Sequence, residues 1–150
     1  QACAGRMLEA GSSLSGRVES DAYAGGVLAF AQHMGGDSAS AEATARAAVA
    51  RGFGDPWTLH AVAHALYAMG RAQECLAFLG QSRQRLPADC SVFMKTHFEF
   101  HVALCLIDLE RADDLAELAE GGGLWGALAA GERADYWAAT GVLGALWKAE

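Results

Sequence analysis

The stretch DPWTLHAVAHALYAMGR, residues 55–71, predicts one amphipathic helix and decides how the rest of the chain is interpreted. Asp55 is a favourable N-cap. Pro56 follows at the first helical position, where a missing N–H has no helical partner to lose. Side chains four residues apart lie on the same face of a helix, so His60 and His64 should point in one direction. The helix therefore carries a pair of imidazoles on a single face.

The pattern of this helix occurs earlier in the chain at an offset of 34 residues, where Tyr23 corresponds to Trp57 and Gly36 to Gly70. Thirty-four residues is the period of the tetratricopeptide repeat, a helix–turn–helix unit. Gly70 is placed to end its helix, as Gly36 is in the earlier copy. We therefore expect helices at residues 21–35, 38–51, 55–69, 72–85, 91–110 and 112–120, and a last helix from Asp135 to about Lys148.

The expected fold class is all-α: a tetratricopeptide-like right-handed α-solenoid of about three helix–turn–helix repeats with a C-terminal capping helix. Abundant Ala, only two Pro and the lack of a β-branched excess agree with a helical protein. We expect a single domain over residues 1–150. Its parts are a lead-in at 1–20, repeats at 21–54, 55–90 and 91–120, and the cap at 121–150.

Charge and composition exclude several classes of partner. The formal net charge of −7 argues against a nucleic acid or an anionic membrane as the partner. No apolar run has the ~20 residues that a membrane span needs, and the start of the chain does not resemble a secretory signal. The four cysteines fit neither a CxxC metal pattern nor a small disulfide framework. We expect a cytoplasmic protein with reduced thiols at Cys3, Cys75, Cys90 and Cys105.

A second histidine pair, His97 and His101, follows the first after 37 residues and has the same spacing of four. In stacked repeats the first helices of successive units lie side by side, with axes ~8–10 Å apart. The imidazoles of His60, His64, His97 and His101 should then converge. Four such nitrogens suit Zn or Cu, or Fe with a further ligand, so we expect a possible transition-metal cofactor. Binding should weaken as the pH falls through ~6.5, where free histidine protonates.

Four further residues are candidates for lining the same groove, each with an alternative role. Trp57 and Tyr67 flank the first pair and serve either repeat packing or stacking on a substrate. Glu99 lies between the second pair in sequence but about 200° from His97 around the helix, so it is expected to point away. Cys105 extends the line of His101 by four residues, and its alternative role is that of a small buried apolar residue.

Residues 55–64, DPWTLHAVAH, resemble the start of a helix in the tetratricopeptide repeat protein 38-like family, and residues 55–110 also match that family's Gly-Arg turn and second H-x-x-x-H pair. The resemblance implies a curved array of helix pairs. Two positions depart from the family pattern. Tyr67 stands where an acidic residue is common, and Phe98 where Asn is common. These departures imply a changed environment around the histidines.

Two functions stay open at this point. The first is a histidine-rich metal-binding site in the concave groove. Whether that site is catalytic stays open, and a catalytic site would make the protein a metal-dependent oxidoreductase or hydrolase. The second is a non-enzymatic adaptor that binds a small molecule, a peptide or a partner protein in the groove, with the histidines as groove or packing residues.

Overall fold

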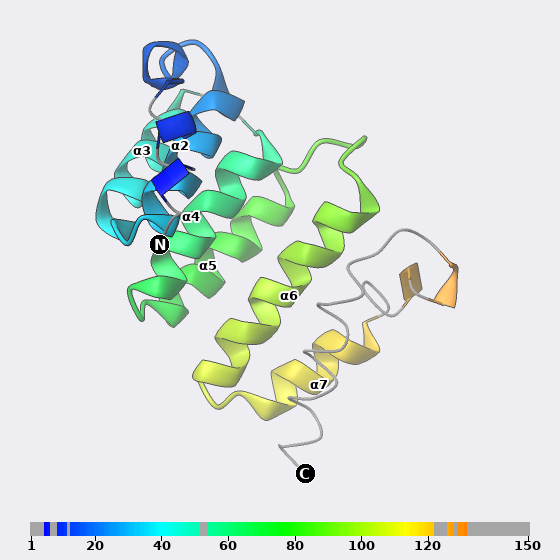
Figure 1. The fold of residues 1–150 in the computed structure, drawn as a ribbon. Helices are drawn as coiled ribbons and strands as arrows, with labels where there is room; N and C mark the ends of the chain where they lie inside the picture. The colour runs from blue at the N-terminus through cyan, green and yellow to red at the C-terminus, as the bar shows by residue number, and fades with distance from the viewer. Residues whose placement is uncertain are drawn as a thin grey trace. The chain divides into compact units, whose positions relative to one another are not determined.

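The computed structural model describes residues 5–6, 9–11, 13–51, 54–121, 126–127 and 129–131, and every regular element in these ranges is a helix (Figure 1). All six helices predicted between residues 21 and 120 are present, each within two residues of its predicted ends. The elements are η1 (Ser15–Arg17), α2 (Ala22–Met34), α3 (Ser38–Ala50), α4 (Pro56–Ala68), α5 (Ala72–Arg83), α6 (Val92–Asp108) and α7 (Ala112–Glu120).

The described residues thus confirm the all-α fold class. The right-handed solenoid and the single-domain organisation stay predictions. The predicted cap from Asp135 to Lys148 lies outside the described residues. Within the described part of the chain, no helix is both long enough and apolar enough to cross a membrane.

The chain divides into two compact units, and each is described by itself. Unit 1 comprises Gln1–Arg71 with Arg85–Pro87, and unit 2 comprises Ala72–Gln84 with Ala88–Glu150. Helices α2, α3 and α4 pack together in unit 1, whereas α6 packs against both α5 and α7 in unit 2.

The turns after α2, α4 and α6 share one backbone geometry, which agrees with a repeated helix–turn–helix plan. In each turn an amide N–H donates to the carbonyl five residues earlier, as in the Schellman ending of a helix. The residue before that amide has a positive φ in all three turns. Glycine fills this position twice and a glutamate once: Gly36 (94°), Gly70 (71°) and Glu110 (54°).

Helix α4 lies very close to α2 because Gly26 has no side chain. A Cβ at Gly26 would lie 2.8 Å from Thr58 Oγ1 and 2.9 Å from the Thr58 amide nitrogen. At this contact the Thr58 hydroxyl donates to the Ala22 carbonyl of α2 at 2.6 Å. The Asp55 carboxylate accepts from the Thr58 amide at 2.7 Å, so the residue that caps α4 also holds its first turn against α2.

Unit 2 has its own core of apolar side chains. Leu79 of α5, Phe98 of α6 and Leu115 of α7 are all buried. Cys75 and Cys105 are fully buried in the same core, and with the buried Cys90 they are free thiols. Cys3 lies outside the described residues.

The contact of Gly26 with Thr58 leads to a test with two identical substitutions. Gly26→Ala should lower the free energy of unfolding by about 1–3 kcal/mol, because its methyl group would have to displace Thr58. Gly80→Ala in α5 should raise it by about 0.5–1 kcal/mol, because a Cβ there meets no atom within 4 Å and alanine favours a helix. Urea unfolding of both variants measures the difference. Equal stability of the two would contradict the close approach of α2 and α4.

Candidate metal centre

The first histidine pair lies on α4 with its rings in contact. His60 is only 3% exposed, whereas His64 is half-buried. Their ring centroids are 4.3 Å apart and the rings are nearly perpendicular, at 74°. The spacing of four residues therefore brings the two imidazoles together on one face of the helix, as predicted.

An aromatic frame holds this first pair. Phe30 of α2 stacks on His60 at a centroid distance of 5.7 Å and meets the edge of His64 at 5.1 Å. Trp57 meets the edge of the His60 ring at 5.5 Å. Because Phe30 comes from α2, the orientation of the pair depends on the packing of α2 against α4.

The fifth histidine of the chain, His33, lies beside the first pair. Its ring centroid is 5.2 Å from that of His64, and its Nδ1 is 3.1 Å from the hydroxyl of Ser38. Burial lowers the pKa of His33 below its ordinary value, which favours the neutral ring. His64 therefore contacts two other imidazoles, that of His60 on the same helix and that of His33 on α2.

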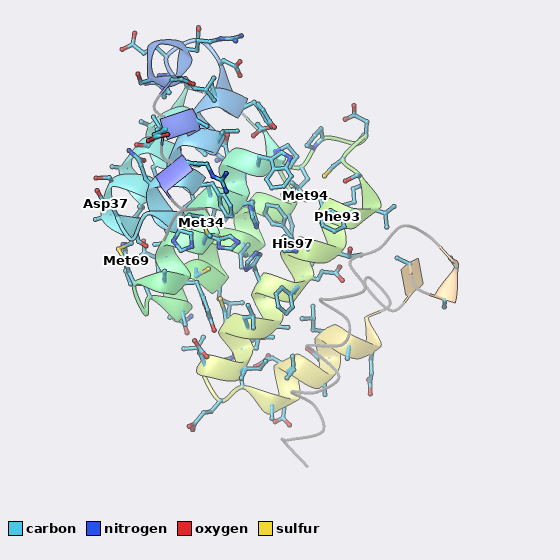
Figure 2. The ribbon with its side chains drawn as sticks, in the orientation of Figure 1. Met34, Asp37, Met69, Phe93, Met94 and His97 are labelled. Atoms are coloured by element: carbon cyan, nitrogen blue, oxygen red, sulfur yellow. The ribbon has the colours of Figure 1, made fainter. Side chains whose placement is uncertain are left out.

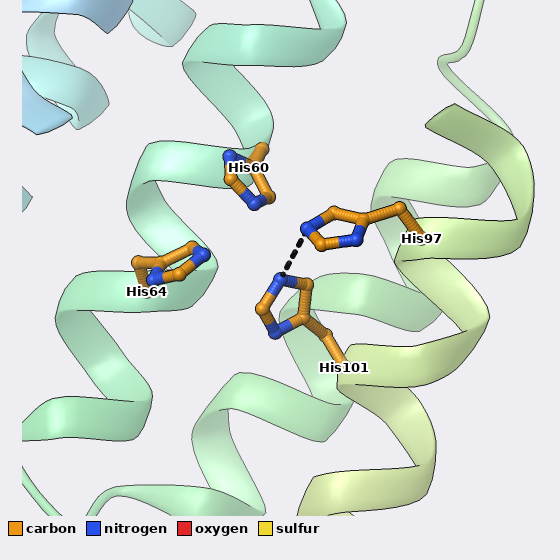
Figure 3. A group of neighbouring side chains, drawn as sticks. All are labelled: His60, His64, His97 and His101. Carbon is orange, nitrogen blue, oxygen red and sulfur yellow. Dashed lines mark hydrogen bonds between the residues drawn. The ribbon is translucent and has the colours of Figure 1, made fainter. Parts of the chain in front are cut away.

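The second pair lies on α6, and its two Nε2 atoms face each other. His97 Nε2 and His101 Nε2 are 3.2 Å apart, the contact that the dashed line in Figure 3 marks. His101 is 4% exposed. Phe93 stacks on His97 with a centroid distance of 5.7 Å and an angle of 9° between the rings, and Figure 2 labels both.

The separation of these Nε2 atoms suits a shared metal ion. In a tetrahedral zinc site with Zn–N bonds of ~2.0–2.1 Å, two ligand nitrogens lie about 3.3 Å apart. The observed 3.2 Å is close to that separation. The two rings of α6 therefore have the spacing of neighbouring ligands before any ion is added.

In the part of the chain that the structure describes, one group of side chains can hold a metal ion, and it consists of the two histidine pairs. One ligand atom from each of the four residues lies within 4.8 Å of the others. The first pair belongs to unit 1 and the second to unit 2. His60 and His101 are buried, and His64 and His97 are half-buried.

The other predicted groove residues have different surroundings. Trp57 contacts His60 but is 43% exposed, so it is not the core aromatic that repeat packing would require. Tyr67 is half-buried near the end of α4. Glu99 is buried and its Oε1 accepts from Arg83 of α5 at 3.3 Å, as expected for a side chain that points away from the histidines.

Cys105 belongs to the core of unit 2. It is fully buried, and its sulfur shares a hydrogen bond with the Cys75 thiol of α5. This hydrogen bond and burial raise the pKa of Cys75 above its ordinary value, so Cys75 keeps its proton. Cys105 therefore has its alternative predicted role, that of a small buried apolar residue.

Three contacts around the histidines were not predicted from the sequence: those of Phe30, His33 and Phe93. The 34-residue offset places two of them at positions equivalent to residues of α4: Phe30 corresponds to His64, and His33 to Tyr67. This correspondence was the available sign that Phe30 and His33 could lie near the first pair. Phe93 lies four residues before His97, on the same face of α6. The helical period alone could have identified it.

Comparison with known protein families, with characterised proteins and with solved structures found no match to this chain. The function is therefore inferred from the residues themselves.

The contact between His97 and His101 predicts a change of tautomer when zinc is added. In the metal-free protein one Nε2 carries a proton and donates to the other, so the two neutral rings are different tautomers. If both Nε2 atoms bind Zn²⁺, both rings must carry their proton on Nδ1. Long-range ¹H–¹⁵N NMR spectra at pH 8 would show this change. A ring that keeps its Nε2 proton in the zinc-loaded protein would contradict it.

Proposed function

We propose that this protein binds one transition-metal ion through four imidazoles, two from α4 and two from α6. The observation that carries the proposal is the group of four histidine ligand atoms that lie within 4.8 Å of one another. Imidazole is a ligand for Zn, Cu and Fe. The Nε2 separation in the second pair makes Zn²⁺ the first ion to test, with Cu²⁺ and Fe²⁺ as the alternatives.

The proposed ligands are all neutral, which determines what the ion can do. Four imidazoles leave the full charge of a divalent ion uncompensated, whereas thiolate or carboxylate ligands would reduce it. Four imidazoles fill the tetrahedral shell of Zn²⁺, so zinc here would stabilise the structure. Cu or Fe can take a further ligand, and such an ion could polarise a bound oxygen and exchange electrons. Glu99 supports no general-base role in this proposal, because its carboxylate is paired with Arg83. The chemistry proposed therefore depends on the ion.

The proposal brings ligands from unit 1 and unit 2 onto the same ion. A solenoid in which α4 and α6 are the first helices of successive repeats would place the pairs side by side, and the resemblance to the tetratricopeptide repeat protein 38-like family supports that arrangement. Both the solenoid and the family membership remain proposals.

The number of ions bound by double variants tests whether the site is shared. Untagged protein stripped of metal should take up one equivalent of Zn²⁺ in titration calorimetry. The variants His60→Gln/His64→Gln and His97→Gln/His101→Gln should each lose tight binding by more than about 100-fold, because two ligands are removed from one ion. His33→Gln should stay within about tenfold of the wild type, since His33 is a neighbour of His64 and not a proposed ligand.

Binding of two ions by the wild-type protein would contradict a shared site. If each pair held its own ion, the wild type would bind two equivalents and each double variant would retain one. If no variant differed from the wild type, the histidines would not be the ligands. Circular dichroism of all variants checks that the helices persist.

A further inference from the structure

A hollow of about 210 Å³ lies next to the first histidine pair, entirely within unit 1. It is formed mainly by α2 and the start of α4. None of the residues that line it carries a charge, and three of them are aromatic. The walls include Tyr23, Gly26, Val27, Phe30, Ala31 and Trp57.

Two walls of this hollow are also the aromatic frame of the histidines. Phe30 lines the hollow and contacts both His60 and His64. Trp57 lines the hollow and contacts His60 at a centroid distance of 5.5 Å. His60 itself does not line the hollow, so the side chains of Phe30 and Trp57 would lie between a bound molecule and the His60 ring.

The size and lining of the hollow select its occupant. An apolar cavity of about 150 Å³ binds benzene in an engineered protein, so a hollow of 210 Å³ has room for one ring with a small substituent. Phe30, Tyr23 and Trp57 offer faces and edges for contact with another aromatic ring. A charged molecule would lose hydration without finding an ion partner among the lining residues.

The hollow is accessible from solvent through two aromatic residues. Tyr23 is 54% exposed and Trp57 is 43% exposed. These two residues correspond at the 34-residue offset, so the hollow is built from the same position of two successive repeat copies. Large exposed aromatic side chains beside an apolar hollow mark a binding site more often than a solvated surface.

We propose that this hollow binds a neutral, single-ring aromatic molecule and holds it against Phe30 and Trp57, two side chains that contact His60. The binding itself needs no metal. Any effect of the molecule on the ion would pass through Phe30 and Trp57, and this part of the inference rests on the proposed four-histidine centre.

Phenol and benzoate are the two probes, because they share one ring and differ in charge at neutral pH. ¹H–¹³C NMR of metal-free protein should show saturable shifts of the Val27 and Ala31 methyl groups and of the His60 ring protons with phenol. Benzoate should bind at least about tenfold more weakly, because its carboxylate finds no partner in the lining. No saturation by phenol, or equal affinity for benzoate, would overturn the inference.

Trp57→Ala and Phe93→Ala form a matched pair of variants. Both residues are aromatic, both are 43% exposed and each contacts a histidine ring, but only Trp57 lines the hollow. Trp57→Ala should weaken phenol binding by about tenfold, and Phe93→Ala should leave it within twofold. Equal effects of the two substitutions would contradict the assignment of the hollow.

A variant that fills the hollow separates this inference from the proposed function. Val27→Phe should abolish the phenol shifts while Zn²⁺ binding by the same sample persists, which also shows that unit 1 is folded. Phenol binding by a wild-type protein that takes up no metal would overturn the four-histidine centre and leave the aromatic site standing. Metal uptake without phenol binding would overturn the aromatic site and leave the four-histidine centre standing.

Discussion

The contact of Gly26 with Thr58 is the constraint on which the first half of the candidate centre depends. It brings α2 and α4 so close that a single methyl group at Gly26 would collide with Thr58. The same approach places Phe30 against both rings of α4 and forms the wall between the apolar hollow and His60. A backbone contact between two helices thus orients the imidazoles and shapes the hollow beside them.

The second pair is held differently, because its two rings contact each other directly. The Nε2 atoms of His97 and His101 are 3.2 Å apart, and Phe93 supports one ring by stacking. In this position one Nε2–H donates to the other Nε2, and a metal ion bound by both nitrogens would take the place of that proton. Both pairs therefore share a principle: a spacing of four on a helix, completed by an aromatic neighbour that limits ring rotation.

The helices and the histidine pairs could be predicted from the sequence because both follow the helical period. Asp55 and Pro56 marked the start of α4, and the 34-residue offset marked its earlier copy. The partners of the pairs could not be predicted in the same way, since the period of one helix does not show which side chains of another helix face it. Phe30 and the exposure of Trp57 depend on how α2 packs against α4, and that packing is set by Gly26 rather than by periodicity.

The central claim is that one ion is bound by four imidazoles, and X-ray absorption spectroscopy of the zinc-loaded protein tests it most directly. The account predicts a first shell of four nitrogens at ~2.0–2.1 Å, with the outer-shell scattering pattern of four imidazole rings. A shell with two imidazoles and two water or other oxygen ligands would show that the pairs do not share the ion. A shell containing sulfur would contradict the account, because the described thiols, Cys75, Cys90 and Cys105, are outside the four-histidine group.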